Sequence, residues 1–251
     1  MILQQIRKQN PLIHCITNYV VANFQANGLL AIGASPVMAD GEDEVESMVQ
    51  LASALSINIG TLNSNTFAAM MKAGVRAGEL NIPVVLDPVG AGATDYRKET
   101  VFALLDKVKF TVVRCNIGEL AAIAKEDWQQ KGVDSGDGSL DVPSAAKQAA
   151  RQYNCIFIVT GEQDFITDGT EERWIRGGHK QMTEVTGTGC LLSAMCAAVI
   201  ALGGNHFENL SALLSCYKQI AEAAYLRASG LGAFQSAVLD ELHARSQGEM
   251  F

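Results

Sequence analysis

The sequence predicts an α/β fold, with a mostly parallel central sheet flanked by helices on both faces. Several strand-like segments are continuous apolar runs, such as residues 55–60 (LSINIG) and 155–161 (CIFIVTG), rather than alternating polar and apolar residues. Such runs are typical of strands that are buried on both faces. The runs alternate along the chain with segments of helical spacing, and this alternation favours a parallel sheet.

Buried strands and helices are expected to alternate through the middle of the chain. The strands are predicted at residues 55–60, 83–90, 110–115 and 155–161, and the helices between them at 64–80, 95–108 and 116–125. Asn116 and Glu119 have the spacing of an N-cap and the third helical residue, so the last of these helices is expected to begin with a capping box.

The two ends of the chain are predicted to be mainly helical. Near the start, one helix is expected from about residue 19 to residue 32, which makes Asn18 its N-cap. Asp168-Gly169 lies between two strand-like runs and predicts a β-hairpin. From Thr188 onward we expect only helices. The polar, glycine-rich segment 126–143 is long for a simple connection, and such loops are often functional or mobile.

Composition limits both the function and the compartment. The 251 residues are enough for one large core, and we expect residues 1–251 to form a single domain. A net charge of −8 without a polybasic segment argues against nucleic acid as a partner. The six cysteines form no C-x-x-C pair, so we expect reduced thiols and a cytoplasmic protein. No signal peptide is expected, and the longest apolar run, residues 190–202, is too short to span a membrane.

Residues 187–190 (GTGC) stand directly before that apolar run, where a helix is expected to begin. Glycine permits positive φ and the close approach of a ligand. A helix N-terminus offers free N–H groups and the positive end of the dipole to an anion. The segment therefore fits a phosphate site around Gly187, and it fits a tight turn into a core helix equally well. The sequence contains no P-loop pattern.

Cys190 is the most specific candidate for chemistry in this segment. A thiol in the first turn of a helix is expected to have a pKa lowered from roughly 8.5. Such a thiol could take a proton from a substrate hydroxyl at neutral pH. The alternative is a buried structural cysteine, which Cys196 is expected to be.

Polar side chains are also expected at the ends of the predicted strands. Ligands of open α/β sheets bind at the carboxyl edge, so Asp87 and Glu119 are candidates for ordering Mg²⁺. Arg114 and Thr160 could hold a nucleotide phosphate at the same edge. Structural alternatives stay open: Asp87 could cap its own loop, Glu119 could serve only the capping box, and Thr160 could only begin a turn.

Two further side chains in residues 10–40, Met38 and His14, are candidates for contacts to a ligand. Met38 follows a proline in an expected loop, and its flexible thioether suits packing on a small flat heterocycle, although an ordinary core position is the alternative. His14 is expected to be a core histidine rather than a base or a metal ligand.

Together these segments resemble one enzyme family. The segments NPLIHCITNYVVANFQANGLLAIGASPVMA, ALSINIGTL, IPVVLDPVGAGAT, NIGEL, TGE and VTGTGC occur in the order found in hydroxyethylthiazole kinases, which belong to the ribokinase-like superfamily. The resemblance covers the chain from Asn10 to about Phe234. It implies a ribokinase-like fold and ATP-dependent phosphorylation of 4-methyl-5-(2-hydroxyethyl)thiazole, a step of thiamine salvage. It also implies Mg²⁺ and a homotrimer with sites at subunit interfaces.

The resemblance also implies a role for each matching residue. Met38 and Asn18 match the thiazole site, and Gly187 matches a substrate-contacting position of the anion hole. Arg114 and Thr160 match nucleotide-binding positions, and Asp87 and Glu119 match the carboxylates that order Mg²⁺. Cys190 matches the position where many ribokinase-like enzymes carry an aspartate base. Departures from the commonest pattern stand at Cys15, Cys115 and Thr188, and Cys115 replaces a frequent glycine.

Two other functions remain open from the sequence. One is a related kinase for a different small alcohol, such as a hydroxymethylpyrimidine or a sugar. The other is a non-catalytic protein that binds thiamine precursors or nucleotide. Release of ADP that depends on an added alcohol would separate the kinases from the binding protein.

Overall fold

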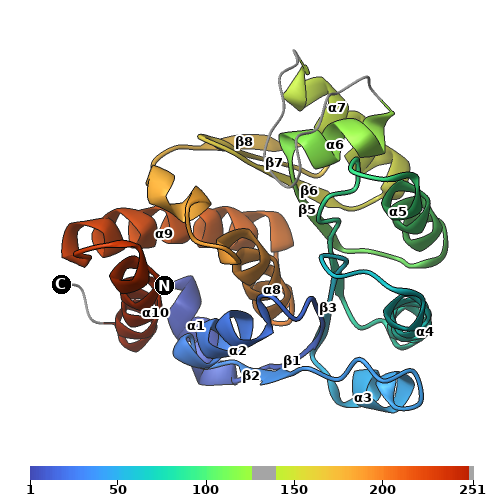
Figure 1. Cartoon of the computed structure of the whole chain (residues 1–251), viewed down its shortest axis with the longest axis horizontal. Coiled ribbons are helices and arrows are strands. Elements are labelled where there is room, and N and C mark those ends of the chain that lie inside the picture. The colour runs from blue at the N-terminus through green and yellow to red at the C-terminus, as the bar shows by residue number, and fades with distance from the viewer. Residues whose placement is uncertain (126–139, 249–251) are drawn as a thin grey trace.

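The computed structural model describes residues 1–125 and 140–248. Its centre is an eight-stranded sheet in the order β2-β1-β3-β4-β5-β6-β7-β8 (Figure 1). The strands are β1 (Leu12–Ile16), β2 (Ser35–Val37), β3 (Ala54–Asn58), β4 (Val84–Asp87), β5 (Val112–Asn116), β6 (Ile156–Thr160), β7 (Asp164–Thr167) and β8 (Glu172–Ile175). Neighbours from β2 to β6 pair in parallel, whereas β7 pairs antiparallel with both β6 and β8. The predicted fold class is therefore confirmed.

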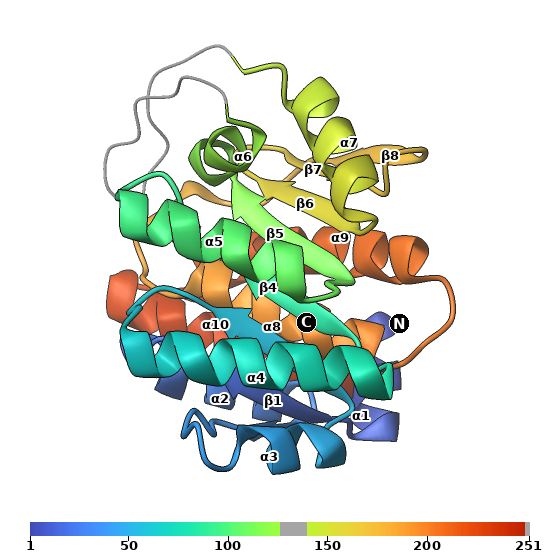
Figure 2. The same ribbon diagram turned by 90° about the vertical axis from the view of Figure 1, so that its right-hand side faces the viewer.

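Helices cover both faces of the sheet, as the sequence predicts. One face carries α1 (Ile2–Gln9), α2 (Ala22–Ala31), α8 (Thr188–Ile200), α9 (His206–Arg227) and α10 (Leu231–Gln247). The other face carries α3 (Val45–Leu51), α4 (Ser64–Leu80), α5 (Asp95–Lys107), α6 (Ile117–Ala124) and α7 (Val142–Tyr153), and Figure 2 looks onto this face. A short 3₁₀ helix, η1 (Lys180–Thr183), precedes α8.

Each face of the sheet has its own apolar core. On the first face, α8 lies at the centre and every residue from Leu191 to Ile200 is buried. This explains the apolar run in the sequence, because a helix covered on all sides needs no polar face. On the second face, α4 packs on the sheet through small and apolar residues such as Ala69, Met70 and Ala73. No helix in residues 1–125 and 140–248 is long and apolar enough to cross a membrane.

The first forty residues differ from the sequence prediction. Two strands, β1 and β2, were not predicted there, and α2 begins at Ala22 rather than near residue 19. Its N-cap is Val21, so the prediction that Asn18 caps this helix was wrong. Asn18 instead accepts a hydrogen bond from the Val21 backbone N–H (3.2 Å), which closes the turn before the helix. Pro36 lies within β2, where it is tolerated because β2 is an edge strand.

Elsewhere the predicted elements match the structure closely. The helix predicted at 64–80 is α4, and the hairpin predicted around Asp168-Gly169 is β7 and β8. Gly169 has φ of +93°, which suits a hairpin turn. Of the long polar segment 126–143, residues 126–139 lie outside the described residues, and Val142 begins α7.

Candidate active site

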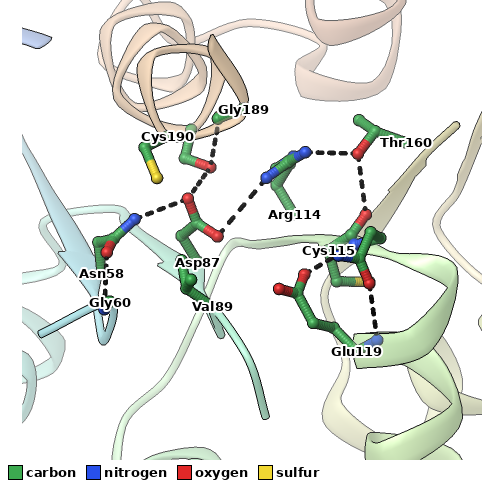
Figure 3. A network of polar contacts seen from close by, with 12 residues as sticks. Asn58, Gly60, Asp87, Val89, Arg114, Cys115, Glu119, Thr160, Gly189 and Cys190 are labelled. Carbon is green, nitrogen blue, oxygen red and sulfur yellow. Dashed lines mark hydrogen bonds and ion pairs between the residues drawn. The ribbon is translucent and has the colours of Figure 1, made fainter. Parts of the chain in front are cut away.

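The carboxyl ends of β3 to β6 meet the N-terminus of α8 at one edge of the sheet (Figure 3). The parallel register places Asn58 opposite Asp87, and Asn116 opposite Thr160. Because each of these residues ends its strand, their side chains gather at the same edge. The structure therefore brings together Asp87, Arg114, Glu119, Thr160 and Cys190, five of the residues singled out in the sequence.

Asp87 is fully buried and is contacted by side chains from three other elements. Its Oδ2 accepts hydrogen bonds from Nδ2 of Asn58 and from Oγ of Ser193, each at 2.8 Å. Its Oδ1 lies 3.6 Å from Nη1 of Arg114 and has no hydrogen-bond partner among the described residues. These contacts argue against the alternative that Asp87 caps its own loop, because its carboxylate contacts side chains of β3, β5 and α8.

Glu119 takes part in the capping box of α6. This confirms the capping box that the spacing of Asn116 and Glu119 predicts. Its Oε2 accepts from the Asn116 N–H (2.8 Å), and its backbone N–H donates to Oδ1 of Asn116 (2.8 Å). The other oxygen, Oε1, accepts from the Gly90 N–H in the loop after β4 (2.9 Å). Burial and the nearby charge of Asp87 raise the pKa of Glu119 to about 7. The carboxyl therefore changes its charge near neutral pH.

Arg114 and Thr160 interact directly across β5 and β6. Nη2 of Arg114 donates to the hydroxyl of Thr160, which itself donates to the carbonyl oxygen of Cys115 (3.3 Å). Arg114 is only 12% exposed, and its buried Nε has no hydrogen-bond partner among the described residues. Cys115 lies inside β5, is buried and does not have positive φ, so this strand needs no glycine at that position.

Gly187 and Gly189 serve the start of α8 in two different ways. Gly187 is the N-cap with φ of +92°, a conformation that L residues rarely adopt. Gly189 has no such φ, but a β-carbon there would lie 2.7 Å from two nitrogens of Arg114. The expected glycine turn into a buried helix is present. It faces the polar cluster, so the two interpretations of residues 187–190 are compatible.

Cys190 is half-buried beside this cluster. Nδ2 of Asn18 lies 3.7 Å from its sulfur, and Nε2 of Gln25 donates to its carbonyl oxygen (2.7 Å). Burial and the charge of Asp87 raise the pKa of the thiol to about 12. The expectation that the first turn of α8 lowers this pKa was therefore wrong. At neutral pH the side chain is a thiol, which is a weak donor and a weak acceptor.

Met38 directly follows β2, and His14 lies within the neighbouring strand β1. Met38 is partly buried and packs against the apolar core of the α8 face. His14 is fully buried and its Nε2 donates to the carbonyl oxygen of Ala39 (2.6 Å), which confirms the core position, although its Nδ1 has no hydrogen-bond partner among the described residues. Burial lowers the pKa of His14, so the ring is neutral and the bond fixes the chain next to Met38.

Asn58 and Ser193 are the main residues that sequence reasoning missed. Asn58 donates to Asp87 and accepts from Nδ2 of Asn18 (2.8 Å) and from the Gly60 N–H (2.9 Å). A signal for it was available, since an asparagine at the end of an apolar strand is rare without a partner. Ser193 stands one turn after Cys190 and looks like any small residue of a buried helix.

The site does not contain a complete metal centre of protein ligands. In the described parts of the chain, no three side chains of His, Cys, Asp or Glu are grouped so that they could hold a metal ion. A divalent cation near Asp87 and Glu119 would therefore need further oxygen ligands from water or from a bound phosphate, as Mg²⁺ commonly has.

Comparison with known proteins places the chain in one family. The family model described as "Hydroxyethylthiazole kinase family" matches residues 3–247. A hydroxyethylthiazole kinase of Lysinibacillus sphaericus is 61% identical over 247 residues, covering 98% of this chain and 97% of the relative. One of Haemophilus influenzae is 50% identical, covering 97% and 94%. The solved hydroxyethylthiazole kinase of Pyrococcus horikoshii superposes with a TM-score of 0.88 at 39% identity, covering 96% of this chain and 91% of that one. Since these matches extend over nearly its whole length, the chain belongs to the hydroxyethylthiazole kinase family.

Proposed function

We propose that this protein transfers the γ-phosphoryl group of ATP to the hydroxyl of 4-methyl-5-(2-hydroxyethyl)thiazole, a step of thiamine salvage. The observation that carries the proposal is the family match over residues 3–247 together with full-length relatives that bear this name. The polar cluster at the start of α8 supports it, because phosphoryl transfer requires mainly alignment and charge stabilisation.

In this proposal the nucleotide lies along the carboxyl edge of the sheet. Arg114 and Thr160 bind its phosphates from β5 and β6. The transferring group faces the Gly187–Cys190 turn, where the N–H groups of the first helical turn and the helix dipole stabilise negative charge. Figure 3 supports this arrangement, because Arg114 lies between Thr160 and Gly189.

Asp87 and Glu119 would hold Mg²⁺ together with the phosphates and water. The residues present fit the ion, because Oδ1 of Asp87 is buried without a hydrogen-bond partner among the described residues. Each oxygen of Glu119 accepts one hydrogen bond from a backbone N–H of the described residues, which leaves a second lone pair for a water of the ion. When bound, Mg²⁺ would neutralise part of the phosphate charge.

The acceptor would lie between Met38 and the Gly187–Cys190 turn, with Asn18 beside it. Cys190 would then orient the acceptor hydroxyl through its sulfur. With a thiol pKa of about 12, only about one molecule in 10⁵ carries a thiolate at pH 7, so ground-state proton removal contributes little. A loose transition state tolerates this, because the alcohol loses its proton late.

We also propose that residues 1–251 form one domain and that three copies assemble in the cytoplasm, with sites at the subunit interfaces. Tyr19 and Val20 directly follow Asn18 and are 83% and 59% exposed. Exposed large apolar side chains that stand together can mark a surface that another protein covers. A second copy of the chain would cover that surface.

One assay tests the proposed activity. ADP release is measured with a panel of thiazole, pyrimidine and sugar alcohols, with and without Mg²⁺. We expect release only with the hydroxyethyl thiazole and only with Mg²⁺. Release with a different alcohol would change the acceptor, and nucleotide binding without turnover on any alcohol would contradict a kinase. Size-exclusion chromatography with light scattering tests the trimer.

A further inference from the structure

A buried ion pair joins α9 to the turn between β6 and β7. Nζ of Lys218 lies 2.9 Å from Oδ1 of Asp164 and donates to the carbonyl oxygens of Gly161 (3.0 Å) and Glu162 (3.3 Å). The two charged side chains are only 13% and 6% exposed. A lysine ammonium has three protons, and these three acceptors use all of them. Lys218 is therefore occupied by the protein and is not available to a ligand.

The partners of Lys218 directly follow a residue of the proposed nucleotide site. Thr160 is the last residue of β6, and the N–H of the next residue, Gly161, donates to the same Oδ1 of Asp164 (3.1 Å). Both the N–H and the carbonyl of Gly161 are thus fixed by the ion pair. The backbone direction after Thr160, and with it the hydroxyl that meets Arg114, depends on this pair.

The neighbouring residue on α9, Tyr217, contacts the start of α8. Tyr217 is buried, and its hydroxyl donates to the carbonyl oxygen of Thr188 (2.9 Å), inside the turn that begins α8. Consecutive residues of a helix point about 100° apart, so Tyr217 and Lys218 reach two different segments. Two adjacent positions of α9 therefore contact both the β6–β7 turn and the start of α8.

We propose that Lys218 and Tyr217 are positioning residues, which set the separation between Thr160 and the N-terminus of α8. This inference rests on the proposed function, because it takes Thr160 as a nucleotide contact. A buried ion pair contributes little net stability, since desolvation offsets the attraction between the charges. Its value here is geometric: a directed ammonium with three acceptors fixes a three-residue turn that contains a glycine.

Binding of ADP, measured by calorimetry without any acceptor, tests the role of Lys218. Lys218→Met should weaken ADP binding about tenfold, the effect of losing one charge-assisted constraint, and Lys218→Arg should recover part of it. The double variant Lys218→Met/Asp164→Asn removes the unpaired carboxylate. It should regain thermal stability while ADP binding stays weak. Lys72→Met, which removes an exposed ion pair with Glu42, is the control and should bind ADP like the wild type.

Tyr217→Phe tests the other half of the proposal. It should lower kcat about tenfold and leave ADP affinity within about twofold of the wild type, because it loosens the start of α8 rather than the β6–β7 turn. A purely structural role would lower thermal stability without this split between kcat and affinity, and that result would overturn the assignment of Tyr217.

Failure of this inference is distinguishable from failure of the proposed function. If Lys218→Met and the double variant bind ADP like the wild type, the positioning role of Lys218 is overturned while the kinase activity stands. If the wild type binds ADP but phosphorylates no thiazole alcohol, the proposed function fails, and the ADP affinities of the variants still decide the role of Lys218. Absence of ADP binding by the wild type would overturn both.

Discussion

Gly189 lies directly against the guanidinium of Arg114, so closely that a β-carbon on Gly189 would stand 2.7 Å from both Nη1 and Nη2. The first turn of α8 and the arginine of β5 are therefore fitted to each other. Whatever moves one of them also moves the other, and with it the contact between Arg114 and Thr160.

Gly189→Ala should raise the KM for ATP about tenfold and lower kcat by a similar factor, because Arg114 has to shift to make room for the methyl group. The matched control is Gly78→Ala in α4, where a β-carbon meets nothing within 4 Å. Steady-state kinetics of both variants check this. Normal kinetics for Gly189→Ala would contradict the coupling between the start of α8 and the position of Arg114.

Cys190→Ala should slow turnover about 10- to 100-fold and leave measurable activity, since the side chain orients the hydroxyl and does not form a bond with it. Cys190→Asp should retain or raise the activity, because a carboxylate at this position can accept the proton. The measurement is kcat with saturating ATP and thiazole alcohol. A wild-type kcat for Cys190→Ala would contradict any role of the thiol in the reaction.

Glu119 should make the stability of the protein depend on pH. Its pKa is raised from 4.5 to about 7 in the folded state, so between these values the folded chain binds more protons than the unfolded chain. Relative to Glu119→Gln, the wild type should lose about 3 kcal/mol of unfolding free energy as pH rises through this window. Urea unfolding at several pH values measures it. Parallel curves for the two proteins would contradict the raised pKa.

The carboxyl group of Glu119 should also set the Mg²⁺ concentration that the reaction requires. Below pH 7 the neutral acid binds a cation poorly, so the Mg²⁺ concentration for half-maximal activity should rise up to about tenfold per pH unit. Glu119→Gln should need more Mg²⁺ at every pH and lose the part of the pH dependence that the wild type owes to Glu119. If the two proteins share one pH profile, Glu119 does not help to hold the ion.

Asp87→Ala should lower kcat/KM about 100-fold or more, because it removes a carboxylate from the proposed cation site and leaves the buried Arg114 without its ion pair. Asp87→Asn keeps the shape and should be better folded but similarly impaired. Activity is titrated against Mg²⁺ in both variants, and thermal unfolding is recorded beside it. Unchanged Mg²⁺ dependence in both would exclude Asp87 as a ligand.

The polar residues at the strand ends were predictable, whereas the contacts that hold them were not. Parallel strands bring their carboxyl ends to one edge, so Asp87, Arg114 and Thr160 could be placed together from sequence. The bond from Ser193 to Asp87 spans 106 positions, and no local pattern marks it. The pKa of Cys190 was predicted in the wrong direction for the same reason. The start of α8 can be predicted from the sequence. The burial of Cys190 and the nearby charge of Asp87 come from segments that are distant in the sequence.

The first strands were missed for a local reason. β1 contains His14, a polar residue whose partner lies 25 positions away, and it is followed by further polar residues, so the run looks less apolar than the later strands. The helix α2 then seemed longer than it is, because Tyr19 and Val20 continue its apolar pattern although they lie in a turn on the surface.

Asn18 and Met38 lie in the short connections after β1 and β2, whereas Asp87, Arg114 and Thr160 are parts of strands. If the roles proposed above hold, residues in loops select the alcohol, whereas residues in strands take part in phosphate transfer. Loops accept substitutions and insertions that strands of a buried sheet do not. Substitutions in the two connections after β1 and β2 can therefore change the alcohol that is bound, while the strand residues that contact the phosphates stay the same.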